Sequence, residues 1–351
     1  MARTLDAMLS CPVPFDHGEI VQLAHGGGGK LTARLIERVF VPAFRNEFLD
    51  ALGDGAVVPF GSERLAFTTD SFVVKPLFFP GGDIGSLAIH GTVNDLAMCG
   101  AEPLFLSGAL VLEEGFPMRD LERIVASMSA ACAGIGVPLV TGDTKVVDRG
   151  KGDGVFVNTS GVGRVREGVR VAPSRATPGD AVLVSGPIGD HGIAVMAARE
   201  GIDFETALTS DSAPVLALVR ALLDTAPDCH VLRDPTRGGL ATALSEIALA
   251  SRVGIRIDEA AVPVRDEVRG ACELLGFDPL YVACEGRFLA IVPGAQADRA
   301  LEAIRSRPEG TEARRIGSVV AEDPGRLVLK TRVGSHRVLE KLSGEQLPRI
   351  C

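Results

Sequence analysis

Residues 91–98 read Gly-Thr-Val-Asn-Asp-Leu-Ala-Met and close an apolar pattern that begins at Ile84. Apolar side chains recur through this pattern at helical spacing, so we predict a helix over residues 84–99. The helix carries the polar pair Asn94-Asp95 in an otherwise apolar stretch. A buried carboxylate needs a partner or a ligand, so we expect Asp95 to face a cleft.

Short strands and helices alternate around this helix from residue 46 to about residue 170. Period-two alternation indicates the strands, and apolar repeats three or four residues apart indicate the helices. The pattern predicts an α/β (α+β) domain over residues 46–170. Its expected strands cover residues 65–74, 103–112, 138–147 and 154–165, and its second helix covers residues 118–135.

A polar stretch punctuated by Pro and Gly, residues 172–180, predicts a domain boundary. We expect a second α/β domain over residues 171–332. A segment with a Gly-rich loop, residues 1–45, comes before the two domains, and a mobile tail, residues 333–351, follows them. The second domain has expected strands at 181–185, 254–257, 287–292 and 326–330, a helix capped by Asp190, and helices at 213–224, 239–251 and 265–275.

Length and composition limit the class of protein. The 351 residues suggest about two domains at roughly 150 residues each. The net charge of −9, the absence of Trp and the single Tyr disfavour a nonspecific nucleic-acid binder. No apolar run approaches the ~18 residues of a membrane span, and no signal peptide is evident. Seven cysteines without a close pair disfavour a metal site made of local Cys pairs. We expect a cytoplasmic protein that binds neither nucleic acid nor membrane.

Acidic residues stand beside Gly, Thr and Asn near the ends of expected strands in five segments. Mg²⁺ prefers oxygen ligands, and hydroxyls and main-chain amides near carboxylates suit a nucleoside triphosphate. Turn chemistry is the simpler explanation for any single segment, whereas five in one chain favour a nucleotide site. The segments are Gly53-Asp54-Gly55, Thr68-Thr69-Asp70-Ser71, Thr92-Val93-Asn94-Asp95, Thr141-Gly142-Asp143-Thr144-Lys145 and Asp234-Pro235-Thr236-Arg237-Gly238-Gly239.

A Gly-rich run, His25-Gly26-Gly27-Gly28-Gly29-Lys30, stands directly before an expected helix. Such a run can bind phosphate through main-chain amides at the helix start. It is neither a P-loop nor a dinucleotide-binding fingerprint, and a flexible connector is the alternative.

The acidic segments also resemble a known family. Residues 67–74, 91–98, 141–147 and 234–240 are similar to the corresponding motifs of the hydrogenase maturation factor HypE. That family belongs to the superfamily of aminoimidazole ribonucleotide synthetase and selenophosphate synthetase. The resemblance runs from about residue 18 to the last residue, and its most specific part is the ending Gly344-Glu345-Gln346-Leu347-Pro348-Arg349-Ile350-Cys351. Residues up to His17 have no clear counterpart.

The resemblance implies a two-domain synthetase-like fold and an activity. In the superfamily the N-terminal sheets of two chains pair across a homodimer, and ATP binds in clefts near that interface. In HypE a carbamoyltransferase, HypF, loads a carbamoyl group onto the terminal Cys. ATP is then used to dehydrate this group to a thiocyanate, and the cyano group passes to the HypC–HypD complex as an iron ligand of [NiFe] hydrogenase.

Residue roles follow from the same resemblance. Cys351 would carry the carbamoyl group, Lys145 would stabilise its oxygen, and Glu285 would be the base. Mg²⁺ would be held by Asp54, Asp70, Asp95 and Asp234. Residues implied at the ATP site are Gly27, Gly28, Lys30, Thr69, Asp70, Asn94, Asp95, Thr141, Asp143 and Thr144.

Each of these roles has a simpler alternative. Lys145 could be a solvated cation at a strand end, Glu285 a turn carboxylate paired with Arg287, and Cys351 an incidental terminal residue. His90 and His191 could contact nucleotide or only fill the first turn of a helix. Prenylation of Cys351 is excluded, because that signal needs the Cys four residues from the end.

Other functions also remain open at this stage. Another synthetase of the superfamily is the first alternative. Selenophosphate synthetase carries a reactive Cys or selenocysteine in its Gly-rich loop, and the run 25–30 has none. A non-catalytic carrier that shuttles a group on Cys351 is the second alternative.

Overall fold

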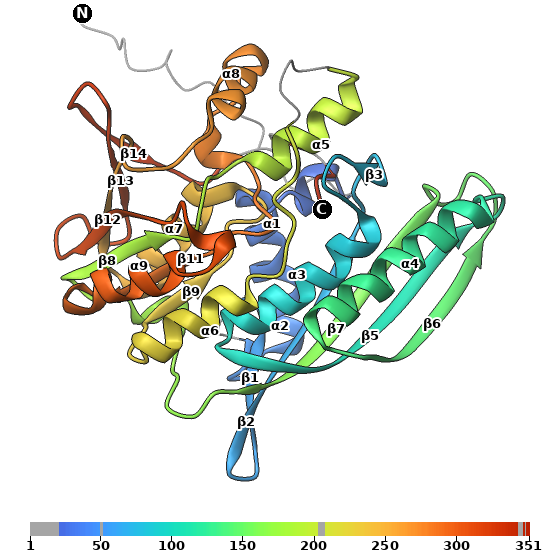
Figure 1. Cartoon of the computed structure of the whole chain (residues 1–351), viewed down its shortest axis with the longest axis horizontal. Coiled ribbons are helices and arrows are strands. Elements are labelled where there is room, and N and C mark those ends of the chain that lie inside the picture. Colours follow the sequence, from blue (N-terminus) through green and yellow to red (C-terminus); the bar gives the residue numbers. More distant parts are fainter. Residues whose placement is uncertain (1–20, 50–51, 203–207, 343–346, 348) are drawn as a thin grey trace, which may run out of the picture.

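The computed structural model describes residues 21–49, 52–202, 208–342, 347 and 349–351. Two α/β halves, each built on one large sheet, account for most of these residues (Figure 1). The C-terminus lies in the middle of the molecule, near α3 (Ile84–Met98) and β3 (Phe78–Phe79). The predicted α/β fold class is confirmed. Residues 1–17 and Gly344, which the sequence analysis singled out, lie outside the described residues.

The N-terminal sheet has five strands and is mixed. β5 and β6 pair in parallel, and the other neighbours are antiparallel. Its order across the sheet is β1 (Ala56–Phe60), β2 (Glu63–Phe72), β7 (Val155–Val165), β5 (Ala101–Glu113) and β6 (Leu139–Val147).

Helix α3 (Ile84–Met98) packs on β2, β7 and β5 and is buried along most of its length. Asp83 caps its first turn, because the Asp83 carboxylate accepts hydrogen bonds from the main-chain amides of Gly85 and Ser86. Such a cap contributes about 1 kcal/mol. Helix α4 (Met118–Ile135) covers α3, and Gly85 lets the two helices come close because a Cβ there would lie 2.5 Å from a carbonyl oxygen of α4.

The C-terminal sheet has seven strands, and its central strand β8 (Asp180–Val184) is buried on both faces. Ala181 and Leu183 pack into the core on one face, and Val182 and Val184 pack into the core on the other. Its order is β14 (His336–Leu339), β13 (Leu327–Lys330), β10 (Gly254–Asp258), β12 (Arg314–Val320), β8, β11 (Leu289–Pro293) and β9 (Val231–Arg233).

Helices cover both faces of this sheet. Helix α7 packs on β10 and β13, whereas α9 packs on β8, β11 and β12 together with α6. The helices are α5 (Asp190–Glu200), α6 (Leu216–Thr225), α7 (Gly239–Ser251), α8 (Asp266–Leu275) and α9 (Ala297–Arg305).

The ends of the chain differ in part from the sequence-based expectation. Residues 30–44 form a continuous helical segment made of α1 (Lys30–Leu35), a π-helical stretch and α2 (Val41–Phe44). The segment 333–351, expected as a tail, begins with strand β14, which pairs with β13. The sequence analysis missed this strand because residues 336–339 are mostly exposed and carry little apolar periodicity.

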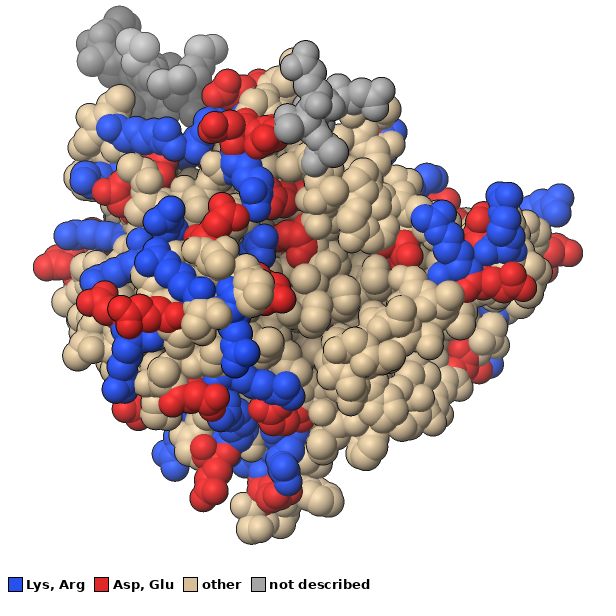
Figure 2. All heavy atoms as spheres, viewed as in Figure 1, with Lys and Arg blue, Asp and Glu red and all other residues tan. Residues whose placement is uncertain are grey.

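One face of the N-terminal sheet is left uncovered by α3 and α4. Phe67 and Phe105 both lie opposite Val162 in the strand pairing, and they are 49% and 51% exposed. Figure 2 shows charged side chains gathered over the C-terminal half and at the far end of the β5–β6 ribbon, with few over α4 and β5 between them. Among the described residues, no helix combines the length and apolar character that crossing a membrane requires.

Candidate active site

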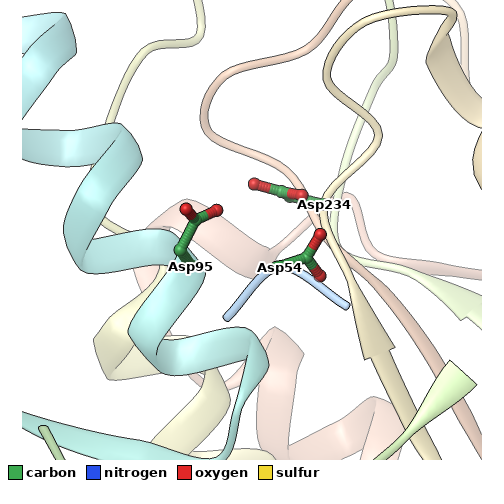
Figure 3. Close-up of side chains that lie close together, drawn as sticks. All are labelled: Asp54, Asp95 and Asp234. Atoms are coloured by element: carbon green, nitrogen blue, oxygen red, sulfur yellow. The ribbon is translucent and has the colours of Figure 1, made fainter. Parts of the chain in front are cut away.

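Three aspartates from distant parts of the chain meet between the two halves. Asp95 lies on α3, Asp54 lies in the loop before β1, and Asp234 follows β9 (Figure 3). One carboxylate oxygen of each lies within 4.8 Å of the others. The predicted metal residues Asp54, Asp95 and Asp234 are therefore brought together.

Neighbouring polar groups hold this cluster in place. The Thr68 hydroxyl on β2 lies 2.7 Å from an Asp95 carboxylate oxygen and 2.9 Å from the main-chain carbonyl of Asp54. The Arg233 guanidinium lies 2.6 Å from the Asp54 carboxylate and 3.1 Å from Glu246. Arg233 thus lies between a carboxylate of the cluster and Glu246.

Electrostatics favour an additional positive charge here. Burial raises the pKa of Asp54 to about 8, although Arg233 opposes the shift. Burial and the charges of Asp234 and Asp54 raise the pKa of Asp95 well above its ordinary range. The pKa of Asp234 is raised for the same reason. Three clustered carboxylates with only oxygen donors fit a hard divalent cation such as Mg²⁺.

The cluster opens into a cavity of about 190 Å³. Most of its lining is polar or charged, and it draws on both halves of the chain. The lining residues are Asp54, Thr69, Asp70, Gly91, Asp95, Arg233, Asp234, Thr236, Arg237, Glu285 and Cys351. Seven of these were predicted from the sequence, namely Asp54, Thr69, Asp70, Asp95, Asp234, Glu285 and Cys351.

Glu285 is fixed through its main chain. The Asn94 side-chain amide donates to the Glu285 carbonyl at 3.2 Å, and the Glu285 amide donates to Asp211 at 3.1 Å. Gly286 permits this approach, because a Cβ there would lie 1.8 Å from the Asp211 carbonyl oxygen. Arg287 pairs with Asp211 at 3.6 Å, so the alternative of a Glu285–Arg287 ion pair is not what the structure shows.

The Glu285 side chain, by contrast, has a carboxylate oxygen that is free to accept a proton. Its Oε1 is buried without a hydrogen-bond partner among the described residues. Burial, then the charges of Asp234 and Asp70, raise the pKa of Glu285 well above its ordinary range, and Arg237 opposes the shift. A carboxylate in such surroundings is an effective base when it is ionised.

Cys351 reaches the same cavity from the end of the chain. Its main-chain oxygen accepts a hydrogen bond from Val73 at 3.0 Å, and Ile350 beside it is buried. Burial raises the pKa of the Cys351 thiol, and the negative charge of Glu285 raises it further, while Arg237 opposes both. The thiol therefore stays protonated at neutral pH.

The Gly-rich run adjoins the cavity through Arg237. Gly27 lines a smaller cavity of about 20 Å³ that shares Arg237. Gly28 has φ +75°, and a Cβ on it would lie 2.8 Å from the Cβ of Arg237. Lys30 pairs with Glu340 at 3.0 Å. The Gly-rich loop thus packs against Arg237 at the wall of the larger cavity. Lys30 does not line that cavity.

Residues of β6 lie elsewhere. Thr141, Asp143, Thr144 and Lys145 are exposed and do not line the cavity of a single chain. Lys145 is 68% exposed and pairs with Asp143 at 2.8 Å. It stands opposite Val111 in the strand pairing, on the sheet face turned away from α3 and α4. Within one chain this matches the alternative of a solvated cation.

Asn94 also differs from its expected place. It is buried, it does not line the cavity, and its amide is bonded to main-chain groups of Ala213, Val215 and Glu285. The sequence analysis did not assign roles to Thr68, Arg233 or Arg237. All three stand within or directly beside the acidic segments. Their closeness to these segments was the feature of the sequence that could have identified them.

Models of two domain families match most of the chain. The AIR synthase related protein N-terminal domain matches residues 52–165, and the corresponding C-terminal domain matches residues 177–330. A carbamoyl dehydratase HypE of Cupriavidus necator is 52% identical over 353 aligned positions, which cover 100% of both chains. The chain belongs to the HypE family.

Solved HypE structures support the same assignment. A HypE–HypF complex matches at 49% identity with a TM-score of 0.84, over 88% of this chain and 99% of that one. HypE in complex with ATP matches at 48% identity with a TM-score of 0.80, over 95% of this chain and 100% of that one. The Cupriavidus HypE also aligns with residues 1–17, for which the sequence analysis expected no counterpart.

Proposed function

We propose that this HypE family member is an ATP-dependent carbamoyl dehydratase acting on the S-carbamoyl group of its own Cys351. The product is a thiocyanate that supplies a cyanide ligand of [NiFe] hydrogenase. One observation carries the proposal: the Cys351 thiol, the Glu285 carboxylate and the three aspartates share one cavity. A carbamoyl group on Cys351 would thus lie beside both a base and a candidate Mg²⁺–ATP site.

The reaction needs each of these groups. The carbamoyl oxygen is a poor leaving group, so it attacks the γ-phosphorus of ATP and ADP departs. The nitrogen then loses its protons, the C–O bond breaks, phosphate leaves, and a C≡N bond forms. Glu285 is the acceptor of a proton from the nitrogen, since it is the carboxylate with an unpartnered, buried oxygen in this cavity.

The polyphosphate is expected near the aspartates and Arg237. Asp54, Asp95 and Asp234, with Asp70 beside them, would hold Mg²⁺, which neutralises charge on the phosphates during transfer. The Arg237 guanidinium adds a fixed cation between the carboxylates and the Gly-rich run. Amides of residues 27–29 would then contact phosphate oxygens at the start of α1.

A homodimer would bring Lys145 to a site. Lys145 shares the uncovered face of the N-terminal sheet with the apolar row Phe67, Val162 and Phe105. Large exposed apolar side chains of this kind mark an interface. Thr69 lies on β2 two residues after Phe67 and lines the cavity, so the edge of this face reaches the cavity. Lys145 of one subunit would therefore stabilise the carbamoyl oxygen in the cavity of the other.

Transfer of the carbamoyl group requires a second protein. The similarity to HypE in the HypE–HypF complex supports a HypF-type partner, and we expect this carbamoyltransferase to load Cys351. A HypC–HypD complex would receive the cyano group, and both steps belong to the cytoplasm. Cys351 must leave the cavity for these two steps. In the described structure Cys351 is docked in the cavity.

The ATP dependence separates this function from that of a passive carrier. The experiment measures ADP release by the isolated protein before and after carbamoylation by HypF, beside the variant Cys351→Ala. A dehydratase releases about one ADP per carbamoyl group lost, and Cys351→Ala shows no carbamoyl-dependent release. Carbamoylated protein that neither loses water nor releases ADP in response to carbamoylation would favour the carrier.

A further inference from the structure

The last three residues are fixed by side chains that the catalytic scheme does not use. His191, in the first turn of α5, is fully buried and bonded at both ring nitrogens. Its Nε2 lies 2.8 Å from the main-chain oxygen of Ile350, and its Nδ1 lies 2.8 Å from the Ser210 hydroxyl. Because a carbonyl only accepts, Nε2 carries the hydrogen and Nδ1 accepts from Ser210.

A second side chain of α5 donates a hydrogen bond to the main-chain carbonyl of the preceding residue, Arg349. The Arg199 guanidinium donates to the main-chain oxygen of Arg349 at 2.7 Å and to that of Lys75 at 2.6 Å. It thereby joins the tail to the segment after β2. Arg349 in turn pairs with Asp153 and donates from Nε to the Val73 carbonyl at 3.1 Å.

The main chain completes this arrangement. The amides of Val73 and Lys75 donate to oxygens of Cys351 and Arg349 at 3.0 and 3.2 Å. These pairs run in opposite directions along the two segments, as in an antiparallel ladder. Residues 349–351 thus lie between α5 of the C-terminal half and residues 73–75 of the N-terminal half and are hydrogen-bonded to both. These contacts hold the chain directly before the Cys351 side chain, which lines the cavity.

We propose that His191 and Arg199 are positioning residues that hold the terminal segment in its docked position and so set how much of the time Cys351 lies beside Glu285. This inference rests on the proposed function, because a docked thiol matters only if Cys351 carries the substrate. The contacts are made to main-chain oxygens, so they hold free, carbamoylated and cyanated Cys351 alike. Weakening them shifts the tail toward exposure without changing the cavity.

The size of the effect follows from the number of bonds lost. Removing one hydrogen bond shifts such an equilibrium by roughly two- to tenfold. His191→Phe keeps an aromatic ring against Phe79, whose ring meets that of His191 edge-on at 5.5 Å, but it donates nothing to Ile350. His191→Gln keeps a donor and an acceptor and is the matched control.

The direct test measures how fast N-ethylmaleimide alkylates Cys351, by mass spectrometry of the C-terminal peptide. Partly exposed Cys132 on α4 serves as the internal reference in the same molecules. We expect His191→Phe to raise the Cys351 rate about two- to tenfold over the reference, and His191→Gln to stay near the wild type. An unchanged rate in a folded His191→Phe protein would overturn the proposal. Arg199→Gln, read in the same way, decides the matter if His191→Phe does not fold.

A second readout separates this inference from the function on which it rests. Carbamoylation by HypF should keep or increase its rate in His191→Phe, because HypF must reach the exposed thiol. Dehydration should slow by less than the factor by which alkylation rises, because the exposed fraction can increase several-fold while most molecules remain docked. Faster alkylation together with slower carbamoylation by HypF would contradict the positioning role. Absence of dehydration in the wild type would instead remove the proposed function while the alkylation result still stands.

Discussion

The side-chain amide of Asn94 donates to the main-chain carbonyl of Glu285 at 3.2 Å, across the boundary between the two halves of the chain. The same amide donates to Ala213 at 3.0 Å, and its oxygen accepts from the Val215 amide at 2.9 Å. One buried residue of α3 therefore ties the proposed base to the helix that also presents Asp95. Together with the bond from the Glu285 amide to Asp211, this contact holds Glu285 at its place relative to Asp95.

Replacing Asn94 should consequently impair the chemical step more than substrate binding. We expect Asn94→Ala to lower kcat for dehydration about tenfold to a hundredfold, because small misplacement of a reacting group is costly. The KM for ATP should change little, since Asn94 does not line the cavity. Single-turnover kinetics on carbamoylated protein measures both. A variant that melts earlier but keeps its wild-type kcat would show that Asn94 has only a structural role.

Asp95 is expected to be essential for ATP turnover. Asp95→Asn removes one of three clustered carboxylates while the Thr68 hydroxyl can still bond to the side chain. Loss of a metal carboxylate should cost several kcal/mol of transition-state stabilisation. Glu246→Gln is the matched control, because Glu246 contacts Arg233 but does not itself line the cavity. Both variants are compared by Mg²⁺-dependent ADP release and by the Mg²⁺-induced rise in Tm. Near-normal values in Asp95→Asn with native circular dichroism would refute the ligand assignment.

Subunit mixing tests whether Lys145 acts across the dimer. Lys145→Ala and Glu285→Gln should each accept the carbamoyl group and then stall before loss of water. Mixed dimers of the two variants contain one intact site if the two residues come from different subunits. Random mixing should then restore roughly a quarter of the wild-type rate. If Lys145 acts within its own chain, the mixture stays as inactive as either variant alone.

The pH dependence of stability should reveal the buried His191. Burial lowers the pKa of His191 to about 4, and the ring faces Ile350, Ser210 and Phe79. Because the pKa of His191 is lower in the folded state, neutral His191 contributes fully to the free energy of unfolding above its unfolded-state pKa near 6.5. This contribution is lost as the pH falls through the folded-state pKa of about 4. The shift corresponds to about 3 kcal/mol. Urea unfolding from pH 7 to pH 4 should therefore show a steeper decline for the wild type than for His191→Gln. Parallel curves would contradict this prediction.

Much of the cavity could be predicted because its chemistry lies in short motifs. Asp54 and Asp234 lie in loops beside strands, whereas Asp70 and Asp95 lie near the ends of β2 and α3, and these parts of the chain converge where the elements pack together. The α/β fold class could also be predicted, because the spacing of apolar residues along the chain reflects which faces of its strands and helices are buried. Residues 181–184 of strand β8, for example, form an uninterrupted apolar run because the strand is buried on both faces.

The parts that could not be predicted depend on contacts between distant residues. Which face of β6 carries Lys145 is set by its register with β5, and an exposed edge strand gives no burial pattern that fixes it. The bond between His191 and Ile350 spans 159 residues, and a buried His has the same letter as a solvated one. Strand β14 was missed because its stability comes from pairing with β13 rather than from apolar side chains.

The most direct test of the central claim is the intact mass of the chain during one round of reaction with HypF, carbamoyl phosphate and ATP. The account predicts a gain that matches one carbamoyl group on the peptide ending in Cys351, followed by the loss of one water. Cys351→Ala should gain nothing while still binding ATP in calorimetry, because the nucleotide site is made by other segments. A carbamoyl group on a different residue, or one that never loses water in the presence of ATP, would contradict the account.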